Sequence, residues 1–542
     1  MSHSRNWCRS DGARGPHYAG VSEPDRNVRH RCDEDGADPA GPAHAAWRGS
    51  QGGGRKWTRR WKHREGDFPE RSGGAHGETV NVAAKEDIVT VTIRTLAGGI
   101  LLGPEELPCS SSIGSLMERV RNSRPGTGCK LLHNTRELLA HDTLVNAPAA
   151  GHRAVDLTAI LTKTYGVVVW GEAAYGGTAG PESQDGVLQL FSSSGAFAVL
   201  KEGGAVVAWG HPAYGGDTSF AARQLTSGVV SVSAGKNAFV ALRKDGAAVA
   251  WGNARFGGKP SGAVAKRLAS GISSVYTSGE AFAALTETGA VVTWGSGVSG
   301  GDSSTVSHWL ASGVTTLCST GGAFAALKDG GSVVTWGNHH SGGDSNAVAA
   351  QLESGVKQVF SNVTSFAALK EEGTVVAWGN ESCGGDVGDV AGQLLRDVIG
   401  IYSSGAAFAA LKADGAVVSW GRPGEPSIAA EHLARGGVAA RTNGQANALV
   451  LEGGGVVTRG DPRSGGDSSG VASQIGAGVT ALASTQGAFA ALKEDGAVVT
   501  WGRANLGGDS SAVSHQLARG VTAVRSTQGA FAAMRDVGSE GI

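Results

Sequence analysis

Short apolar runs recur in pairs along the chain from about residue 166 to its end. In the copy from Gly478 to Gly520, the run AFAAL (Ala488–Leu492) is followed by AVVTW (Ala497–Trp501) after the turn residues KEDG. A glycine that closes a short turn between two apolar runs is a strong signal for a β-hairpin. Because both runs are apolar on both faces and do not alternate, we expect neighbouring elements to cover the hairpin on both sides.

The dipeptide Trp-Gly gives the period of this pattern. A phenylalanine stands twelve residues before nearly every such tryptophan from Trp209 on, whereas the intervals between successive units vary from 39 to 43 residues. The constant spacing fits a rigid hairpin, so all length variation lies in the segment after Trp-Gly. The dipeptide begins at Trp170, Trp209, Trp251, Trp294, Trp336, Trp378, Trp420 and Trp501, and Arg459-Gly460 stands in the gap.

The rest of the unit contains a glycine-rich loop, a short helical segment and a third strand. The loop ends in GGD, and Asp509 or Ser510 is expected to cap one or two helical turns that end before Gly520. A strand such as VTALAS then leads into the next hairpin. A unit of this size cannot bury its own faces, so the copies must stack in a line or around a ring.

The two ends of the array favour a ring. The array starts inside a unit at Gly166–Gly171, without the phenylalanine strand, and stops inside a unit after Gly520–Asp536, without the Trp-Gly strand. Joined together, the halves make one blade, and closure removes the exposed edges of an open array. We predict a mainly β chain with a β-propeller-like ring of about nine short blades, in which Val167–Trp170 pairs with Ala530–Met534. An open β superhelix is the alternative.

The repeats resemble those of the regulator of chromosome condensation family, which share an aromatic-bearing strand, a Trp-Gly hairpin and a glycine-rich segment after the tryptophan. The resemblance covers residues 166–538. It implies a β-propeller whose ring closes with a split blade, and the family includes a guanine-nucleotide exchange factor for a small nuclear GTPase. Here the units are shorter, the glycine-rich segment reads GGD, and about nine units replace the family's usual seven.

Residues 88–161 differ from the repeats in their pattern of apolar residues, and this pattern predicts a small α+β domain. Val89, Val91 and Ile93 alternate as in a half-buried strand, and LAGG supplies a hairpin turn before a second apolar run. Ser112 is expected to cap a helix, because apolar residues follow it at helical spacing. The later strands are expected at Cys129–His133 and Ala154–Leu161.

This order and several of its residues resemble ubiquitin: TLAG at the first turn, KLLHNTREL around the third strand, DTL at Asp142–Leu144, and the closing strand. The resemblance implies a β-grasp fold, with the apolar patch that ubiquitin presents to its receptors at Leu96, Leu132 and Thr158. Because the third position is polar, weaker binding of the usual receptors is implied. A small β-grasp domain without a role in the ubiquitin pathway is the alternative.

Residues 1–86 are rich in Gly, Arg, Asp, His and Pro and poor in aliphatic residues, so we expect a disordered tail. Within it, RKWTRRWKHR (Arg55–Arg64) has seven basic side chains, counting His63, together with Trp57 and Trp61. Such a segment can hold RNA or single-stranded DNA by phosphate neutralisation and stacking. The alternative is a solvated basic run.

Composition narrows the class of protein. The chain has 542 residues, 87 glycines and a formal net charge of −1, so no overall field attracts it to nucleic acid or to a membrane. The six cysteines are scattered without a CxxC pair, which predicts reduced thiols. No signal-peptide pattern opens the chain, and no run of about 18 apolar residues occurs. We expect a soluble protein of the cytoplasm or nucleus, without a membrane partner.

No constellation in the sequence indicates a reaction, a metal or a cofactor. A residue present in every blade is more economically a determinant of the fold than a catalyst, because catalysis needs one asymmetric group of side chains. The repeated aspartate after Gly-Gly has no second carboxylate at constant spacing, so helix capping is favoured over cation binding. His339 and His340 are adjacent but have no partner at metal-ligand spacing.

One repeat departs from the others, because Asn447 replaces the phenylalanine and Arg459 replaces the tryptophan. This loss indicates either drift in a redundant repeat or exposure of Arg459 to a partner, since arginine is a common interaction anchor. The sequence thus predicts a non-catalytic protein-interaction scaffold whose ubiquitin-like module recruits ubiquitin-pathway components. The alternatives are a guanine-nucleotide exchange factor and a non-catalytic component of a ubiquitin ligase assembly.

Overall fold

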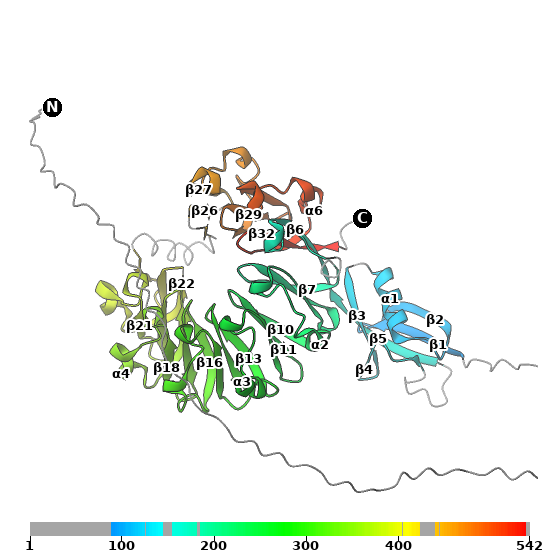
Figure 1. Ribbon diagram of the computed structural model, residues 1–542, viewed down its shortest axis with the longest axis horizontal. Helices are drawn as coiled ribbons and strands as arrows, with labels where there is room; N and C mark the ends of the chain where they lie inside the picture. Colours follow the sequence, from blue (N-terminus) through cyan, green and yellow to red (C-terminus); the bar gives the residue numbers. More distant parts are fainter. Residues whose placement is uncertain are drawn as a thin grey trace, which may run out of the picture. The chain divides into compact units, whose positions relative to one another are not determined.

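The computed structural model describes residues 88–124, 126–144, 154–180, 185–403, 405–422, 440–443, 445–451 and 453–537 (Figure 1). The predicted tail, residues 1–86, lies outside the described residues, and so does its basic segment Arg55–Arg64. The fold is mainly β, as predicted, and its strands belong to one five-stranded sheet and a series of three-stranded blades.

The first described part is a mixed sheet with one helix. The sheet order is β2-β1-β5-β3-β4, with β1 and β5 parallel. The side chain of Ser112 accepts a hydrogen bond from the backbone N–H of Ser115 and caps the helix, whose apolar stripe is buried against the sheet. The elements are β1 (Ile88–Thr95), β2 (Ile100–Pro108), α1 (Ile113–Ser123), β3 (Thr127–His133), β4 (Arg136–Leu138) and β5 (Ala154–Lys163).

The repeat region forms blades of three antiparallel strands. In the described residues, eight blades take all three strands from one stretch of chain. Their strands are β7 (Val187–Ser192), β8 (Ala196–Lys201), β9 (Val206–Gly210), β10 (Val229–Ala234), β11 (Ala238–Arg243), β12 (Ala248–Gly252), β13 (Ile272–Thr277), β14 (Ala281–Thr286), β15 (Val291–Gly295), β16 (Val314–Ser319), β17 (Ala323–Lys328), β18 (Val333–Gly337), β19 (Val356–Ser361), β20 (Ser365–Lys370), β21 (Val375–Gly379), β22 (Val398–Ser403), β23 (Ala407–Lys412), β24 (Val417–Gly421), β25 (Ala440–Thr442), β26 (Ala446–Val450), β27 (Val456–Gly460), β28 (Val479–Ser484), β29 (Ala488–Lys493) and β30 (Val498–Gly502).

The remaining blade is shared between the two ends of the array, as predicted. Strands β31 (Val521–Ser526) and β32 (Ala530–Asp536) pair with β6 (Tyr165–Gly171), and Ala530–Met534 lies opposite Gly171–Val167. Figure 1 shows β6 beside β32. The eight complete blades and this shared blade make nine. Only Thr164 separates β5 from β6, so the mixed sheet continues almost directly into the shared blade.

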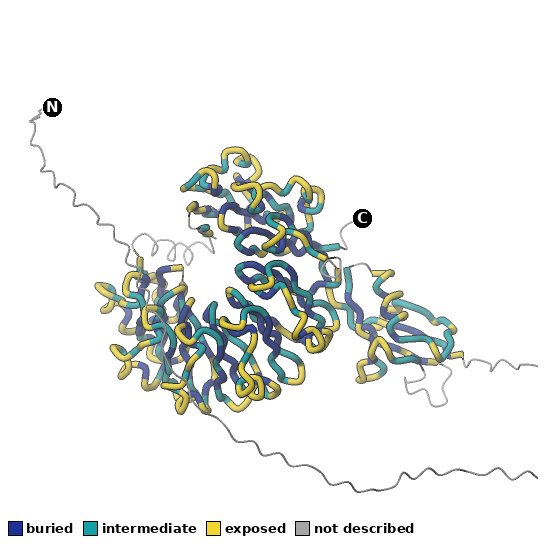
Figure 2. The backbone as a smooth tube through the Cα atoms, in the orientation of Figure 1, coloured by how far each residue is buried: buried dark blue, intermediate teal, exposed yellow. Residues whose placement is uncertain are grey.

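The core of the repeat region lies between neighbouring blades. The middle strand of each blade is apolar on both faces because both faces are covered: Ala283 of β14 packs toward the next blade, whose Phe324 and Trp336 belong to the same cluster. Figure 2 shows these middle strands as buried segments and the connecting loops as exposed ones. Each hairpin has apolar residues on both faces, and this pattern correctly predicted that neighbouring blades cover both of them.

Short helical turns follow most of the Trp-Gly strands. The α-helical ones are α2 (Ala222–Leu225), α3 (Gly262–Arg267), α4 (Ala349–Leu352) and α6 (Ser514–Leu517). The 3-10 turns are η2 (Ala173–Tyr175), η4 (Glu202–Gly204), η5 (Pro212–Tyr214), η6 (Ala254–Phe256), η7 (Gly297–Ser299), η8 (Ser304–Val306), η9 (His339–Ser341), η10 (Asn346–Val348), η11 (Glu381–Cys383), η12 (Gly388–Leu394), η13 (Pro462–Ser464), η14 (Ser469–Val471), η15 (Ala504–Leu506) and η16 (Ser511–Val513).

Candidate functional site

The repeated tryptophan joins each blade to the one before it. The indole N–H of Trp336 donates to the carbonyl of Gly300, which lies in the loop of the preceding blade, at 2.9 Å, and the ring stacks on Phe324 with centroids 5.3 Å apart. Gly300 has a φ of +93°, and a Cβ there would lie 2.6 Å from the Phe324 ring. The pattern therefore explains three repeated residues at once: the phenylalanine, the tryptophan and a glycine of GGD.

This indole hydrogen bond recurs through the described blades and spans the shared one. Trp170 of β6 donates to Gly507 at 3.0 Å, which links the first strand of the array to the last complete blade. All of these residues serve the fold, since they are buried and occur in blade after blade. The other donors are Trp209, Trp251, Trp294, Trp378, Trp420 and Trp501.

The repeated aspartate lies one residue before the N-cap position and accepts from the first backbone N–H of the turn, so it does not occupy the predicted cap position itself. Asp509 accepts a hydrogen bond from the backbone N–H of Ser511 at 2.9 Å, and this bond lowers the pKa of the Asp509 carboxyl. The same contact is made by Asp217, Asp302, Asp344, Asp386 and Asp467. Within the described ranges, no three His, Cys, Asp or Glu side chains are grouped so as to hold a metal ion.

Arg459 lies opposite Asn447 on paired strands, and both residues are exposed. In the same blade Val457 is 52 % exposed, whereas the corresponding Val418 and Val499 of the two flanking blades are buried, and Leu451 at the hairpin turn is 44 % exposed. The sequence before it is unusual too, because the segment after Trp420 reads RPGEPS and lacks the GGD that supplies the carbonyl acceptor elsewhere. The sequence therefore lacks both the tryptophan donor and the GGD motif at the same junction.

Two of the three patch residues predicted from the resemblance to ubiquitin, Leu132 and Thr158, lie on the sheet face opposite α1. Leu132 of β3 and Thr158 of β5 are direct cross-strand partners, and both are half-buried. Leu96 follows directly after β1 and is 75 % exposed. On the other side of the same strands, Leu131 and Leu157 are buried in the core. We call Leu96, Leu132 and Thr158 the β-grasp face.

Side chains of the ring hold the mixed sheet in place, a feature that no sequence pattern indicated. Glu202, in η4 after β8, accepts a hydrogen bond from the backbone N–H of Cys129, and its other oxygen lies 3.2 Å from Arg121 Nε. Lys163 at the end of β5 pairs with Asp536 of β32 at 2.7 Å. These contacts and the one-residue connection at Thr164 join the mixed sheet to the shared blade and to η4.

The thiol of Cys129 is expected to be unreactive. Burial, followed by the nearby charge of Glu202, raises the pKa of Cys129 to about 11, and Arg121 opposes this shift only in part. At pH 8 only about one Cys129 in a thousand is then a thiolate, which is the reactive form. Alkylation by iodoacetamide should modify Cys109, which is half-exposed, long before Cys129. Equal rates at the two residues in the folded protein would contradict this prediction.

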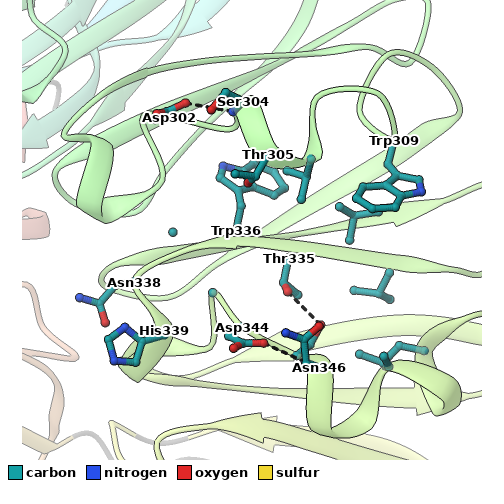
Figure 3. Close-up of a pocket in the computed structure, with 18 of the residues that line it drawn as sticks. Asp302, Ser304, Thr305, Trp309, Thr335, Trp336, Asn338, His339, Asp344 and Asn346 are labelled. Atoms are coloured by element: carbon teal, nitrogen blue, oxygen red, sulfur yellow. Dashed lines mark hydrogen bonds between the residues drawn. The ribbon is translucent and has the colours of Figure 1, made fainter.

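A groove lies over strand β18, between the segment that follows β15 and the segment that follows β18 (Figure 3). Its volume is about 1030 Å³. Figure 3 shows Trp309 at one end of the groove and His339 at the other, with Asp302 and Asp344 on either side of the strand that carries Trp336. We call it the Trp309 groove.

Departures from the repeat gather in the Trp309 groove. Trp309 is 50 % exposed and stands where most other repeats have glutamine, for example Gln351 and Gln516. Val298, which is 72 % exposed, and the exposed Glu353 also line the groove at positions where most repeats have other residue types. Sequence reasoning missed this site, although aligning the repeats and marking an exposed tryptophan in place of glutamine would have found it.

The comparisons with known proteins agree with the repeat assignment. A family model for the regulator of chromosome condensation (RCC1) repeat matches residues 229–257, which include β10, β11 and β12. No curated protein sequence matches the chain. In the described residues, no helix is long and apolar enough to span a membrane.

Several solved structures are similar to parts of this chain at low identity. Prp20p from Saccharomyces cerevisiae is 14 % identical over 69 % of this chain and 92 % of its own, with a TM-score of 0.31. Human WBSCR16 is 16 % identical over 69 % of this chain and 99 % of its own, with a TM-score of 0.28. The ectodomain of the Physcomitrella patens receptor kinase CR4 is 15 % identical, with a TM-score of 0.27. The match covers 44 % of this chain and only 61 % of that ectodomain.

Proposed function

Because the ring is built from repeats of the regulator of chromosome condensation type, we propose that this chain is a non-catalytic scaffold that binds proteins. In this proposal the ring holds the β-grasp face in one position, and that face recruits receptors of the ubiquitin pathway. The observation that supports the proposal is that Leu132 and Thr158 are cross-strand partners on one side of the sheet and that Leu96 is exposed in the turn after β1. Glu202 and Lys163 contact residues across the junction between this sheet and the ring.

The contacts between module and ring support a scaffold for a physical reason. A binding face on a flexible tether samples many orientations, whereas a face held by ion pairs and a one-residue connection loses little further freedom on binding. The blade that carries Arg459 provides the second binding surface in this proposal. Its exposed guanidinium, with Leu451 and Val457 nearby in the same blade, offers a partner both charge and apolar area.

Substitution of the β-grasp face tests this function. The full chain should bind at least one member of a panel of isolated ubiquitin-binding domains, and Leu96→Ala combined with Leu132→Ala should weaken that binding about tenfold or more, because exposed apolar anchors carry most of an interface's free energy. The measurement is isothermal titration calorimetry. Leu395→Ala, which removes a 64 % exposed leucine of the ring, is the matched control and should bind as the unsubstituted chain does.

Two results would reject the ubiquitin-linked function. One is binding of no domain in the panel by the unsubstituted chain, and the other is equal binding by the double variant. The exchange-factor alternative is favoured by the match to the RCC1 repeat, and the solved Prp20p structure is described together with binding to Gsp1p and histones. Release of labelled GDP from small GTPases measures it directly, and acceleration by the chain would contradict a scaffold without catalytic activity.

A further inference from the structure

The floor of the Trp309 groove is apolar, and its valines are more exposed than the corresponding valines of the two neighbouring blades. Val333 and Val334 of β18 are both half-exposed, whereas the corresponding valines of β15 and β21 are all buried. Val298 and Trp309 add two exposed apolar side chains of the preceding blade. The corresponding buried residues are Val291, Val292, Val375 and Val376.

The rim of the groove is acidic. Asp302, Asp344 and Glu353 line it and are exposed, and no lysine or arginine is among its lining residues in the described chain. The hydrogen bond from the backbone N–H of Ser304 lowers the pKa of Asp302, so this carboxylate is charged at neutral pH. Lys328 is close by, but its ammonium group donates a hydrogen bond to the backbone carbonyl of Trp309.

We propose that the Trp309 groove binds an extended, basic segment of a partner protein, in which a large apolar side chain is flanked by arginine or lysine. The apolar side chain covers Val334 and Val298, because Val333 points to the opposite face of β18. The flanking cations pair with the three carboxylates. An arginine can also stack on the exposed indole face of Trp309, which a cation attracts electrostatically. The volume of about 1030 Å³ suits several residues of a peptide.

The charges of the groove decide against an anionic occupant. Nucleic acid brings one phosphate charge per nucleotide, and three carboxylates without a basic neighbour in the lining repel it. The proposal concerns a surface separate from the β-grasp face, so its success or failure does not depend on ubiquitin-pathway binding.

Binding of designed peptides to the full chain tests the proposal. The probe is a fluorescein-labelled peptide in which one tryptophan is flanked on each side by two arginines, and fluorescence anisotropy measures its dissociation constant. Trp309→Gln should weaken binding about tenfold through loss of the stacking surface. Glu353→Ala should weaken it roughly threefold through loss of one exposed charge pair. Both replacements are residue types that other repeats carry at these positions, for example Gln516 and Ala518, so the blade is expected to stay folded.

Matched controls separate the groove from general charge attraction. Gln516→Ala changes the position that corresponds to Trp309 in another repeat, and Glu494→Ala removes an exposed carboxylate from a hairpin turn; neither should alter binding. A peptide with glutamates in place of the arginines, and one with serine in place of the tryptophan, should each bind at least tenfold more weakly. Absence of binding by the arginine peptide, or equal loss in the control variants, would overturn the proposal.

Discussion

Deletion of residues 521–542 should expose the amides of Val167–Trp170 to rapid hydrogen exchange, although these residues lie at the opposite end of the array. Strand β6 pairs with β32 over its whole length, whereas its pairing with β7 is limited to Tyr165 opposite Val187. Without β32, the amide hydrogen bonds of β6 and the stacking of Trp170 on Phe531 are lost. Hydrogen exchange with mass spectrometry measures the change.

A blade on the far side of the shared one serves as the control for this deletion. The strands β10, β11 and β12 make no pairing with the deleted segment, so their protection should fall much less than that of β6. In an open superhelix each unit touches only its sequence neighbours, and protection at Val167–Trp170 would be unchanged. That result would contradict the shared blade.

Trp336→Ala should lower the free energy of unfolding by about 3–5 kcal/mol, the usual cost of removing a large buried aromatic side chain. Trp336 is 3 % exposed, stacks on Phe324 and donates to the carbonyl of Gly300, so the change creates a cavity and leaves a buried acceptor unpaired. Because repeat arrays do not always unfold in one step, the transition that reports on β16–β18 is the one to follow.

Trp309→Ala is the matched comparison, since it removes the same side chain from a surface position of the preceding blade. Trp309 is 50 % exposed, so its loss should cost under about 1 kcal/mol. Urea denaturation with hydrogen exchange as the local probe distinguishes the two variants. Similar costs for both would mean that Trp336 does not anchor its blade.

The repeated elements could be predicted from the sequence, because a residue that recurs at the same position in many units has a structural role that a single occurrence would not reveal. The constant distance from phenylalanine to tryptophan predicts an antiparallel hairpin, and Phe489 indeed lies opposite Trp501. The complementary half-units predict the pairing of β6 with β32. Aspartate after Gly-Gly predicts a cap, and the Asp509 carboxylate accepts from Ser511, although from one residue before the N-cap position. In each case one local rule, applied many times over, was sufficient.

The contacts between units could not be predicted, because they join residues whose spacing has no local meaning. The acceptor of the Trp336 indole is Gly300, in the loop of the preceding blade. The contact between Glu202 of η4 and Arg121 of α1 joins two elements that are far apart in the sequence. The Trp309 groove could not be predicted for a different reason, because a single tryptophan has no periodicity that marks it in the sequence. The groove is recognised only in the structure, where Val333 and Val334 of β18 are both half-exposed.

The shared blade also places a demand on the protein while it is being synthesised. The hydroxyl of Thr527 donates to the carbonyl of Tyr175, a residue 352 positions earlier in the chain. At a translation rate of roughly 5–20 residues per second, the later residue leaves the ribosome about 18 to 70 s after the earlier one. For that time the apolar strand Val167–Trp170 lacks its pairing partner β32, and its backbone hydrogen-bonding groups stay open to pairing with other chains.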